Sequence, residues 1–260
     1  MKTKYPIILV HGIALKDFKF VKSFGEIDRI LKIQGHIVYK ANTDGFGSVK
    51  SNAELLKEEI LKILEKENVD KVNIIAHSKG GLDSKYMIQH LNMEEHVASL
   101  TTLCTPHKGS PIATNLLKLP KFLIKFIAFW INFWYKIFGD KQPNAYLTCQ
   151  ELQRIDSLEV EILNFSENVY CQSYSTEMKK SKDDFIMGIP LMFSKFFEKN
   201  QITDGVVPQD STVFGEYKGM ALDDSISHSE IVDFMVKKKK KDKIYMFYSS
   251  LCEELVNKGF

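Results

Sequence analysis

The sequence has little cysteine, and its four cysteines lie far apart in 260 residues. None belongs to a CxxC pair. This pattern disfavours a zinc knuckle and gives no framework of disulfides. We expect isolated buried thiols at Cys104, Cys149, Cys171 and Cys252.

The sequence also lacks a marked excess of positive or negative charge. The chain carries 35 Lys and Arg against 33 Asp and Glu, for a formal net charge of +2. Bulk electrostatics therefore favour neither a nucleic acid nor an acidic substrate, and we expect no nucleic-acid partner. A composition that is 44% hydrophobic and 26% charged is typical of a soluble globular protein. The length suffices for a single α/β domain over residues 1–260 with its own core.

The N-terminus lacks the apolar leader and small-residue cleavage site of a signal peptide. Residues 1–6 run directly into the apolar stretch Ile7–Val10, which leaves no room for such a leader. The sequence as it stands predicts a cytoplasmic protein, or an extracellular one if it is a processed form.

Apolar strands alternate with amphipathic helices through the first hundred residues. The predicted strands are apolar throughout, as expected when helices cover both faces of a parallel sheet. In the predicted helices the apolar residues recur at helical spacing. The predicted strands cover residues 5–10, 36–41, 72–76 and 97–104, and the predicted helices cover 21–34, 52–67 and 81–91.

The alternation breaks near residue 110 and resumes later. We expect an inserted segment at about 110–146, then a helix over 148–166, a strand over 169–176 and a last helix over 243–257. Residues 177–200 give no regular pattern. The order of predicted strands and helices indicates an α/β fold with a mostly parallel central sheet and helices on both faces.

The stretch Ala76–Gly80 (AHSKG) resembles the G-x-S-x-G pentapeptide, with alanine in place of its first glycine. Small residues are needed there because the residues two before and two after the serine pack together in a tight strand-to-helix turn. An apolar strand precedes this serine and a helix follows it. Ser78 is therefore the predicted nucleophile, since such a turn exposes its hydroxyl above the sheet.

A serine nucleophile needs a histidine base. Of the seven histidines, His228 alone lies late in the chain, in a loop rich in serine and aspartate. We expect His77, next to Ser78, to face the opposite way, and His107 to line the site as a structural residue. His228 is therefore the predicted base.

The base needs a carboxylate to orient it. Asp204 lies in a Thr-Asp-Gly turn 24 residues before the predicted base and is the first choice. Asp223 and Asp224 are open alternatives, and Asp210 is a further competitor, although all three read as surface carboxylates.

Two backbone N–H groups are predicted to form the oxyanion hole. One is that of Lys79, directly after the nucleophile, and the other is that of Ile13, in the His-Gly loop after the first strand.

Together these segments resemble the bacterial triacylglycerol (true) lipases of the α/β-hydrolase superfamily. The matching stretches are 8–13, 76–82, 105–110 and 204–208, followed by His228. The resemblance implies the α/β-hydrolase fold, a Ser78–Asp204–His228 triad and oxyanion N–H groups at Ile13 and Lys79. We expect no cofactor and no catalytic metal. Relatives often hold a structural calcium ion, for which Glu230 and either Asp183 or Asp184 are the matching carboxylates here.

Residues 121–138 (KFLIKFIAFWINFWYKIF) are nearly all apolar and rich in aromatic side chains. As a helix, this stretch would carry a narrow lysine stripe and a wide apolar face, which suits a helix lying at a lipid surface. We predict an inserted helical lid that closes over the site in water, with Phe122, Phe126, Trp130 and Trp134 contacting substrate. The alternative is a helix buried in a dimer interface or under the second half of the chain.

The sequence thus predicts a serine ester hydrolase that acts on acylglycerols or similar lipid esters, with transient membrane contact through residues 121–138. A phospholipase, a thioesterase or an acyltransferase would use the same residues. A catalytically silent protein that binds lipid or a partner through the aromatic stretch is the alternative from another class.

Overall fold

The computed structural model describes residues 2–14, 16–17, 22–154, 168–197 and 201–260. Within these residues one sheet has the strand order β2-β1-β3-β4-β5-β6, and every neighbouring pair is parallel. This confirms the predicted α/β class. The strands are β1 (Ile7–Val10), β2 (Val38–Lys40), β3 (Val72–His77), β4 (Val97–Leu103), β5 (Tyr170–Glu177) and β6 (Glu216–Ser225).

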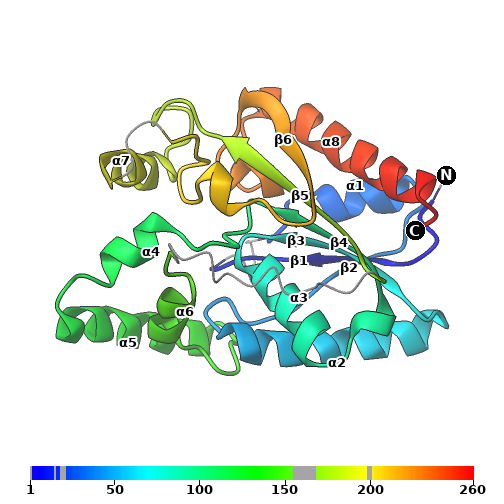
Figure 1. The fold of residues 1–260 in the computed structure, drawn as a ribbon, viewed down its shortest axis with the longest axis horizontal. Helices are drawn as coiled ribbons and strands as arrows, with labels where there is room; N and C mark the ends of the chain where they lie inside the picture. The colour runs from blue at the N-terminus through cyan, green and yellow to red at the C-terminus, as the bar shows by residue number, and fades with distance from the viewer. Residues whose placement is uncertain (1, 15, 18–21, 155–167, 198–200) are drawn as a thin grey trace.

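Helices cover both faces of the sheet, as predicted. Helices α1 (Ile27–Ile33) and α8 (Lys238–Asn257) lie on one face, and α2 (Val49–Glu67) and α3 (Lys79–His90) lie on the other (Figure 1). Ile7 and Leu9 of β1 belong to the core under α1 and α8, whereas Ile8 and Val10 belong to the core under α2. Successive residues of a strand point to opposite faces, so a strand covered on both sides is apolar throughout.

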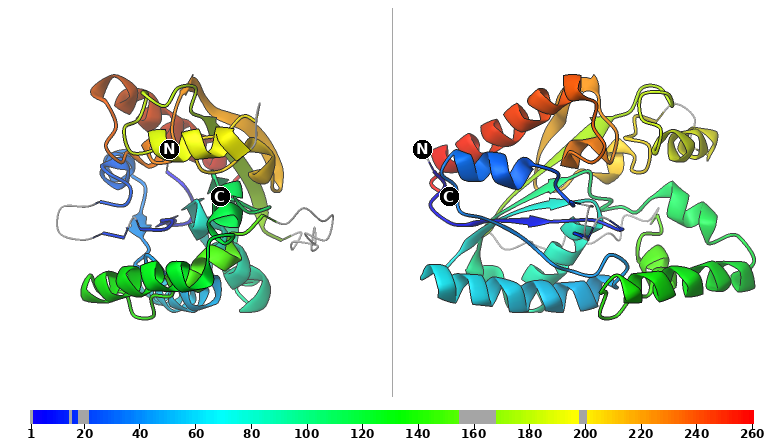
Figure 2. Two further views of the ribbon diagram at one scale, coloured as in Figure 1. Left: turned by 90° about the vertical axis from the view of Figure 1, so that its left-hand side faces the viewer. Right: turned by 180° about the vertical axis from the view of Figure 1, so that it is seen from behind.

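The remaining helices gather at the end of the molecule opposite the two termini (Figures 1 and 2). They are α4 (Pro111–Leu116), α5 (Lys121–Ile137), α6 (Ala145–Glu151) and α7 (Gly188–Phe197). Elsewhere in the described residues, single turns of 3-10 helix cover Glu94–His96, Gln209–Ser211 and Glu230–Val232. Helices α5 and α7 lie on opposite sides of this end, with α4 between them (Figure 2). None of the described helices is long and apolar enough to cross a membrane.

Two buried carboxylates fasten the C-terminal end of α5 to the loop after β2. Asp140 accepts the backbone N–H groups of residues 45 and 46, each at 3.0 Å. In return, Asp44 accepts those of residues 141 and 142, at 2.8 and 2.6 Å. The Lys16 ammonium lies 3.5 Å from Asp44 and 3.4 Å from Asp140 and offsets one of their two negative charges. We call these three side chains the carboxylate clasp.

Several predicted element boundaries differ from the structure. The helix expected over 21–34 begins only at Ile27, and the last helix begins at Lys238 rather than 243, so the lysine run forms its first turn. The helix expected over 148–166 appears as α6, which ends at Glu151, and residues 155–166 lie outside the described residues. Helix α7 and strand β6 were not predicted.

Candidate active site

Ser78 lies between β3 and α3 with backbone φ 53° and ψ −131°. Non-glycine residues rarely adopt positive φ, so this strain points to an over-determined turn. The surroundings need small residues: a Cβ on Gly80 would lie 2.5 Å from the His11 carbonyl oxygen, and one on Gly12 would lie 2.6 Å from the Ser78 Cβ. Ala76 is fully buried, which shows that one methyl is accommodated at the remaining position.

The structure brings the three predicted catalytic side chains together. The Ser78 hydroxyl lies 2.9 Å from His228 Nε2, and His228 Nδ1 lies 2.6 Å from Asp204 Oδ2. With the proton on Nδ1, the imidazole donates to the carboxylate and accepts from the serine, which is the arrangement needed by a general base. All three residues are buried.

Asp204 is held as an acceptor by its own turn. Its Oδ1 accepts the N–H groups of Val206 and Val207 at 2.8 and 2.7 Å, and its carbonyl accepts the N–H of His228 at 2.9 Å. The competing carboxylates lie elsewhere. Asp210 pairs with Arg154 and Asp224 pairs with Lys243, both near the surface.

The two histidines assigned structural positions behave differently from expectation. His77 does not face away from the site: its Nε2–H donates to the His228 carbonyl at 2.9 Å, and the two rings lie 4.6 Å apart. Burial holds the pKa of His77 well below its usual range, so this ring is neutral. His107 does not line the cavity but stacks on Phe214, and burial lowers its pKa to about 3.

The two predicted oxyanion N–H groups flank the nucleophile. Ile13 lines the cavity beside Ser78, and Lys79 follows Ser78 directly as the first residue of α3. Neither backbone N–H has a hydrogen-bond acceptor among the residues that the structure describes. Both are therefore available to an oxyanion, and that role stays a prediction.

The Lys79 side chain turns inward and forms a buried ion pair. Its Nζ lies 2.6 Å from Asp83 Oδ1, and Asn52 donates to Asp83 Oδ2 at 3.0 Å. Both side chains are almost fully buried. Burial raises the pKa of the Asp83 carboxyl to about 6 despite the nearby ammonium. The pair lies at the start of α3 and so supports the turn that carries Ser78.

We expect Lys79→Met to lower the free energy of unfolding by about 3–5 kcal/mol, because it leaves the Asp83 carboxylate buried without its counter-charge. Denaturant unfolding well above pH 6, where Asp83 is ionised, measures this change. The double variant Lys79→Met/Asp83→Leu is the control, and it should recover most of the loss because it removes both charges. Equal losses in the single and double variants would show that packing matters here rather than charge.

An apolar cavity of about 590 Å³ opens onto the Ser78 hydroxyl. Its wall comes from the helices inserted after β4 and from the loop at residues 186–187. The side chains that α5 turns into it are Ile124, Ile127, Ala128 and Ile131, and α4 adds Ile112 and Leu116.

The four aromatic residues predicted to contact substrate do not line this cavity. Their side chains lie on the outer face of α5, where Phe122 is 77%, Phe126 60%, Trp130 46% and Trp134 51% exposed. The helix has apolar residues on both faces, so the sequence pattern did not distinguish the face toward the cavity. The smaller aliphatic residues face inward and line the cavity.

Comparisons with known proteins give one family match and several lipase relatives. The family model described as the PGAP1-like alpha/beta domain matches residues 40–173, just over half of the chain. Triacylglycerol lipase 2 of Saccharomyces cerevisiae is 25% identical over 90% of this chain and 73% of its own length. A triacylglycerol lipase of Pseudarthrobacter phenanthrenivorans is 41% identical over 43% of this chain, which spans only 36% of that protein.

Among solved structures, the Bacillus licheniformis lipase BlEst2 in its mature form superposes with a TM-score of 0.64 at 20% identity. The match covers 94% of this chain and 91% of that one. At this identity the likeness shows the fold alone, which is that of the α/β-hydrolases.

Proposed function

This chain belongs to the family of PGAP1-like α/β domains, and from that premise we propose that it is a serine hydrolase of lipid esters such as acylglycerols. The observation that carries the proposal is the hydrogen bond from the Ser78 hydroxyl to His228 Nε2 at the wall of an apolar cavity. The names of the yeast and bacterial relatives support a triacylglycerol or a similar ester as the substrate class.

In the proposed reaction Ser78 attacks the ester carbonyl while His228 accepts its proton. The negative charge that develops on the carbonyl oxygen is stabilised by the N–H groups of Ile13 and Lys79. His228 then protonates the leaving alcohol, and Asp204 stabilises the imidazolium. Water, activated by the same histidine, hydrolyses the acyl-enzyme.

The cavity supports an acyl group of some length as the ligand. Burial of each methylene contributes up to about 0.8 kcal/mol, so kcat/KM should rise as much as about fourfold per carbon until the cavity is filled. A series of p-nitrophenyl esters from short to long acyl chains measures this rise. A flat or falling series would contradict the lipid-ester proposal and indicate a hydrolase of short esters. Acylated thiols and phospholipids in the same assay separate a thioesterase or a phospholipase from a lipase.

Two exposed apolar helix faces support contact between the cavity end of the molecule and a lipid surface. The first is the outer face of α5, whose lysines 121, 125 and 136 suit contact with lipid headgroups. The second lies on and before α7, which comes near α4. Its exposed residues are Phe185 (97%), Ile189, Met192, Phe193 and Phe196. Apolar patches this wide on a soluble domain mark interaction sites. We include α7 with α5 in the proposed surface, and a lid movement of α5 remains part of the proposal.

We expect Phe126→Ser/Trp130→Ser to lower activity on aggregated ester at least about tenfold relative to activity on monomeric ester. The two substitutions remove apolar area that a lipid surface would bury. They leave the aliphatic residues of the cavity wall unchanged. Measuring both activities and vesicle flotation checks the result. The control is Ile33→Ser, which removes a side chain that is 72% exposed on α1, at the other end of the molecule. An unchanged ratio of the two activities would rule out the α5 contact.

A further inference from the structure

The two serines that flank His228 share one acceptor. The Ser227 and Ser229 hydroxyls donate to the same Asp184 oxygen, Oδ2, at 2.5 and 2.8 Å. The other oxygen, Oδ1, accepts the N–H groups of Ile186 and Met187 at 2.7 and 3.2 Å. One carboxylate thus holds both neighbours of the histidine and connects them to the loop before α7.

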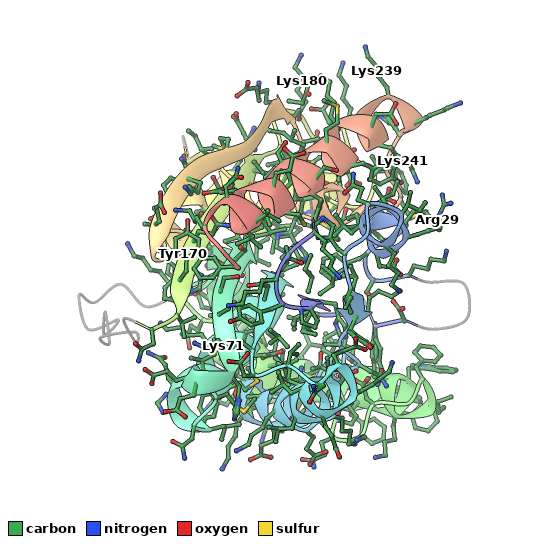
Figure 3. All side chains as sticks on the ribbon, turned by 90° about the vertical axis from the view of Figure 1, so that its right-hand side faces the viewer. Arg29, Lys71, Tyr170, Lys180, Lys239 and Lys241 are labelled. Atoms are coloured by element: carbon green, nitrogen blue, oxygen red, sulfur yellow. The ribbon has the colours of Figure 1, made fainter. Side chains whose placement is uncertain are left out.

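A second carboxylate holds the same loop from the other side. Glu230 is 2% exposed, and both of its oxygens lie on the Lys240 ammonium, at 2.8 and 2.7 Å. Its Oε2 also accepts the Ser227 N–H, and its own N–H donates to the Ser227 hydroxyl, each at 3.1 Å. The pair links the loop to the first turn of α8. The neighbouring Lys239, by contrast, extends outward from the surface (Figure 3).

These carboxylates are the ones that the lipase resemblance offered to a calcium ion, and they do not fit it. Calcium takes six to eight oxygen ligands with free lone pairs. Asp184 already accepts four N–H or O–H groups, and Asp183 Oδ2 accepts the Ser225 hydroxyl and the Lys180 N–H. At Glu230 an ammonium occupies the position that a cation would take. The Glu230 charge is therefore balanced by Lys240, and the oxygens of Asp184 and Asp183 Oδ2 are taken up by N–H and O–H donors of the chain.

We propose that Lys240, acting through Glu230 together with Asp184, positions the His228 loop and does so in place of a divalent cation. This inference rests on the proposed hydrolase function. The distance from Ser78 to His228 is set by a loop of four residues, 226–229, whose side chains and backbone are tied by this network. Displacement of a catalytic group by about 1 Å can cost about a hundredfold in rate. Lys240, Glu230 and Asp184 are accordingly positioning residues, since none of them reaches the reacting atoms.

The test is Lys240→Met, assayed with a monomeric ester in the intact chain. We expect kcat to fall about tenfold to a hundredfold while KM changes little, because the cavity wall is untouched. Lys240→Arg should restore most of kcat, since the guanidinium can hold both Glu230 oxygens. The unaltered chain should keep its kcat and its melting temperature in millimolar EGTA and gain neither from millimolar calcium. Ser229→Ala, which removes one hydroxyl, is the milder variant if Lys240→Met folds poorly, and it should lower kcat without raising KM.

The matched control is Lys243→Met. Lys243 lies on α8 like Lys240, and its ammonium forms an exposed ion pair with Asp224 of β6 at 2.6 Å, which the substitution breaks. It should keep the kcat of the unaltered chain. If Lys240→Met and Ser229→Ala both equal this control in kcat, or if EGTA lowers the activity of the unaltered chain, the positioning network is wrong while the hydrolase function stands. If the unaltered chain hydrolyses no ester, the proposed function is wrong and the positioning role is refuted with it.

Discussion

Asp204→Asn should lower kcat by about four orders of magnitude. In the unaltered chain His228 Nδ1 lies 2.6 Å from the Asp204 carboxylate. The amide keeps the shape of the side chain but presents a donor or a neutral acceptor to this nitrogen. The imidazole then loses both the tautomer that accepts the Ser78 proton and the charge that stabilises the imidazolium. The Val206 and Val207 N–H groups still meet Oδ1, so the turn should fold. Steady-state kinetics on a monomeric p-nitrophenyl ester measures the loss.

Asp224→Asn provides the comparison, because this carboxylate also occurs late in the chain but pairs with Lys243 at the surface. It should leave kcat within about twofold, as surface pairs contribute little. Near-normal turnover of Asp204→Asn together with a large loss in Asp224→Asn or Asp223→Asn would move the acid role to that residue.

Ser78→Ala should abolish covalent labelling by a fluorophosphonate and lower kcat by about a millionfold. The label reports the nucleophile itself, since it reacts with a serine hydroxyl activated by the adjacent imidazole. Mass spectrometry of the labelled chain should place the adduct in the peptide that contains Ser78. The substitution removes one oxygen from a buried turn, so the fold should be retained and circular dichroism should not change.

Ser250→Ala serves as the control, because this serine lies exposed on α8. Its labelling and turnover should match those of the unaltered chain. A folded chain that takes up no label at Ser78 would contradict the enzyme proposal and favour a silent protein that binds lipid.

The first half of the fold could be predicted because its pattern is local. Residues Ile7–Val10 are apolar at every position since they are covered on both faces, and a tight serine turn requires small residues. The second half lacks such signals. Strand β6 (EYKGMALDDS) lies at the edge of the sheet and is only partly buried, so its residues are mixed in polarity. Helix α7 is apolar on its exposed face, where a helix of a soluble domain usually carries polar residues.

In the site, the small-residue turn indicated Ser78, and position in the chain indicated Asp204 and His228. The structure places His228 within hydrogen-bond distance of both other residues. What could not be predicted is the support around them. The contact from His77 to the His228 carbonyl depends on the rotamer of a residue next to the nucleophile. The Asp184 contact crosses more than forty residues, from Asp184 to Ser227 and Ser229. Its one visible signal was the run of serines around His228.

The carboxylate clasp anchors the C-terminal end of α5, and this determines which end can move in the proposed lid movement. Asp140 ties that end to the loop after β2, and the Tyr135 hydroxyl donates to the Ala14 carbonyl in the loop that carries Ile13. The other end begins at Pro120, about 25 Å away along a helix of 17 residues. A tilt of roughly 20° about the clasp would carry that far end about 9 Å while the end beside the Ile13 loop hardly moves. In the proposed movement the entrance therefore widens beside α4, and the backbone N–H of Ile13 keeps its place.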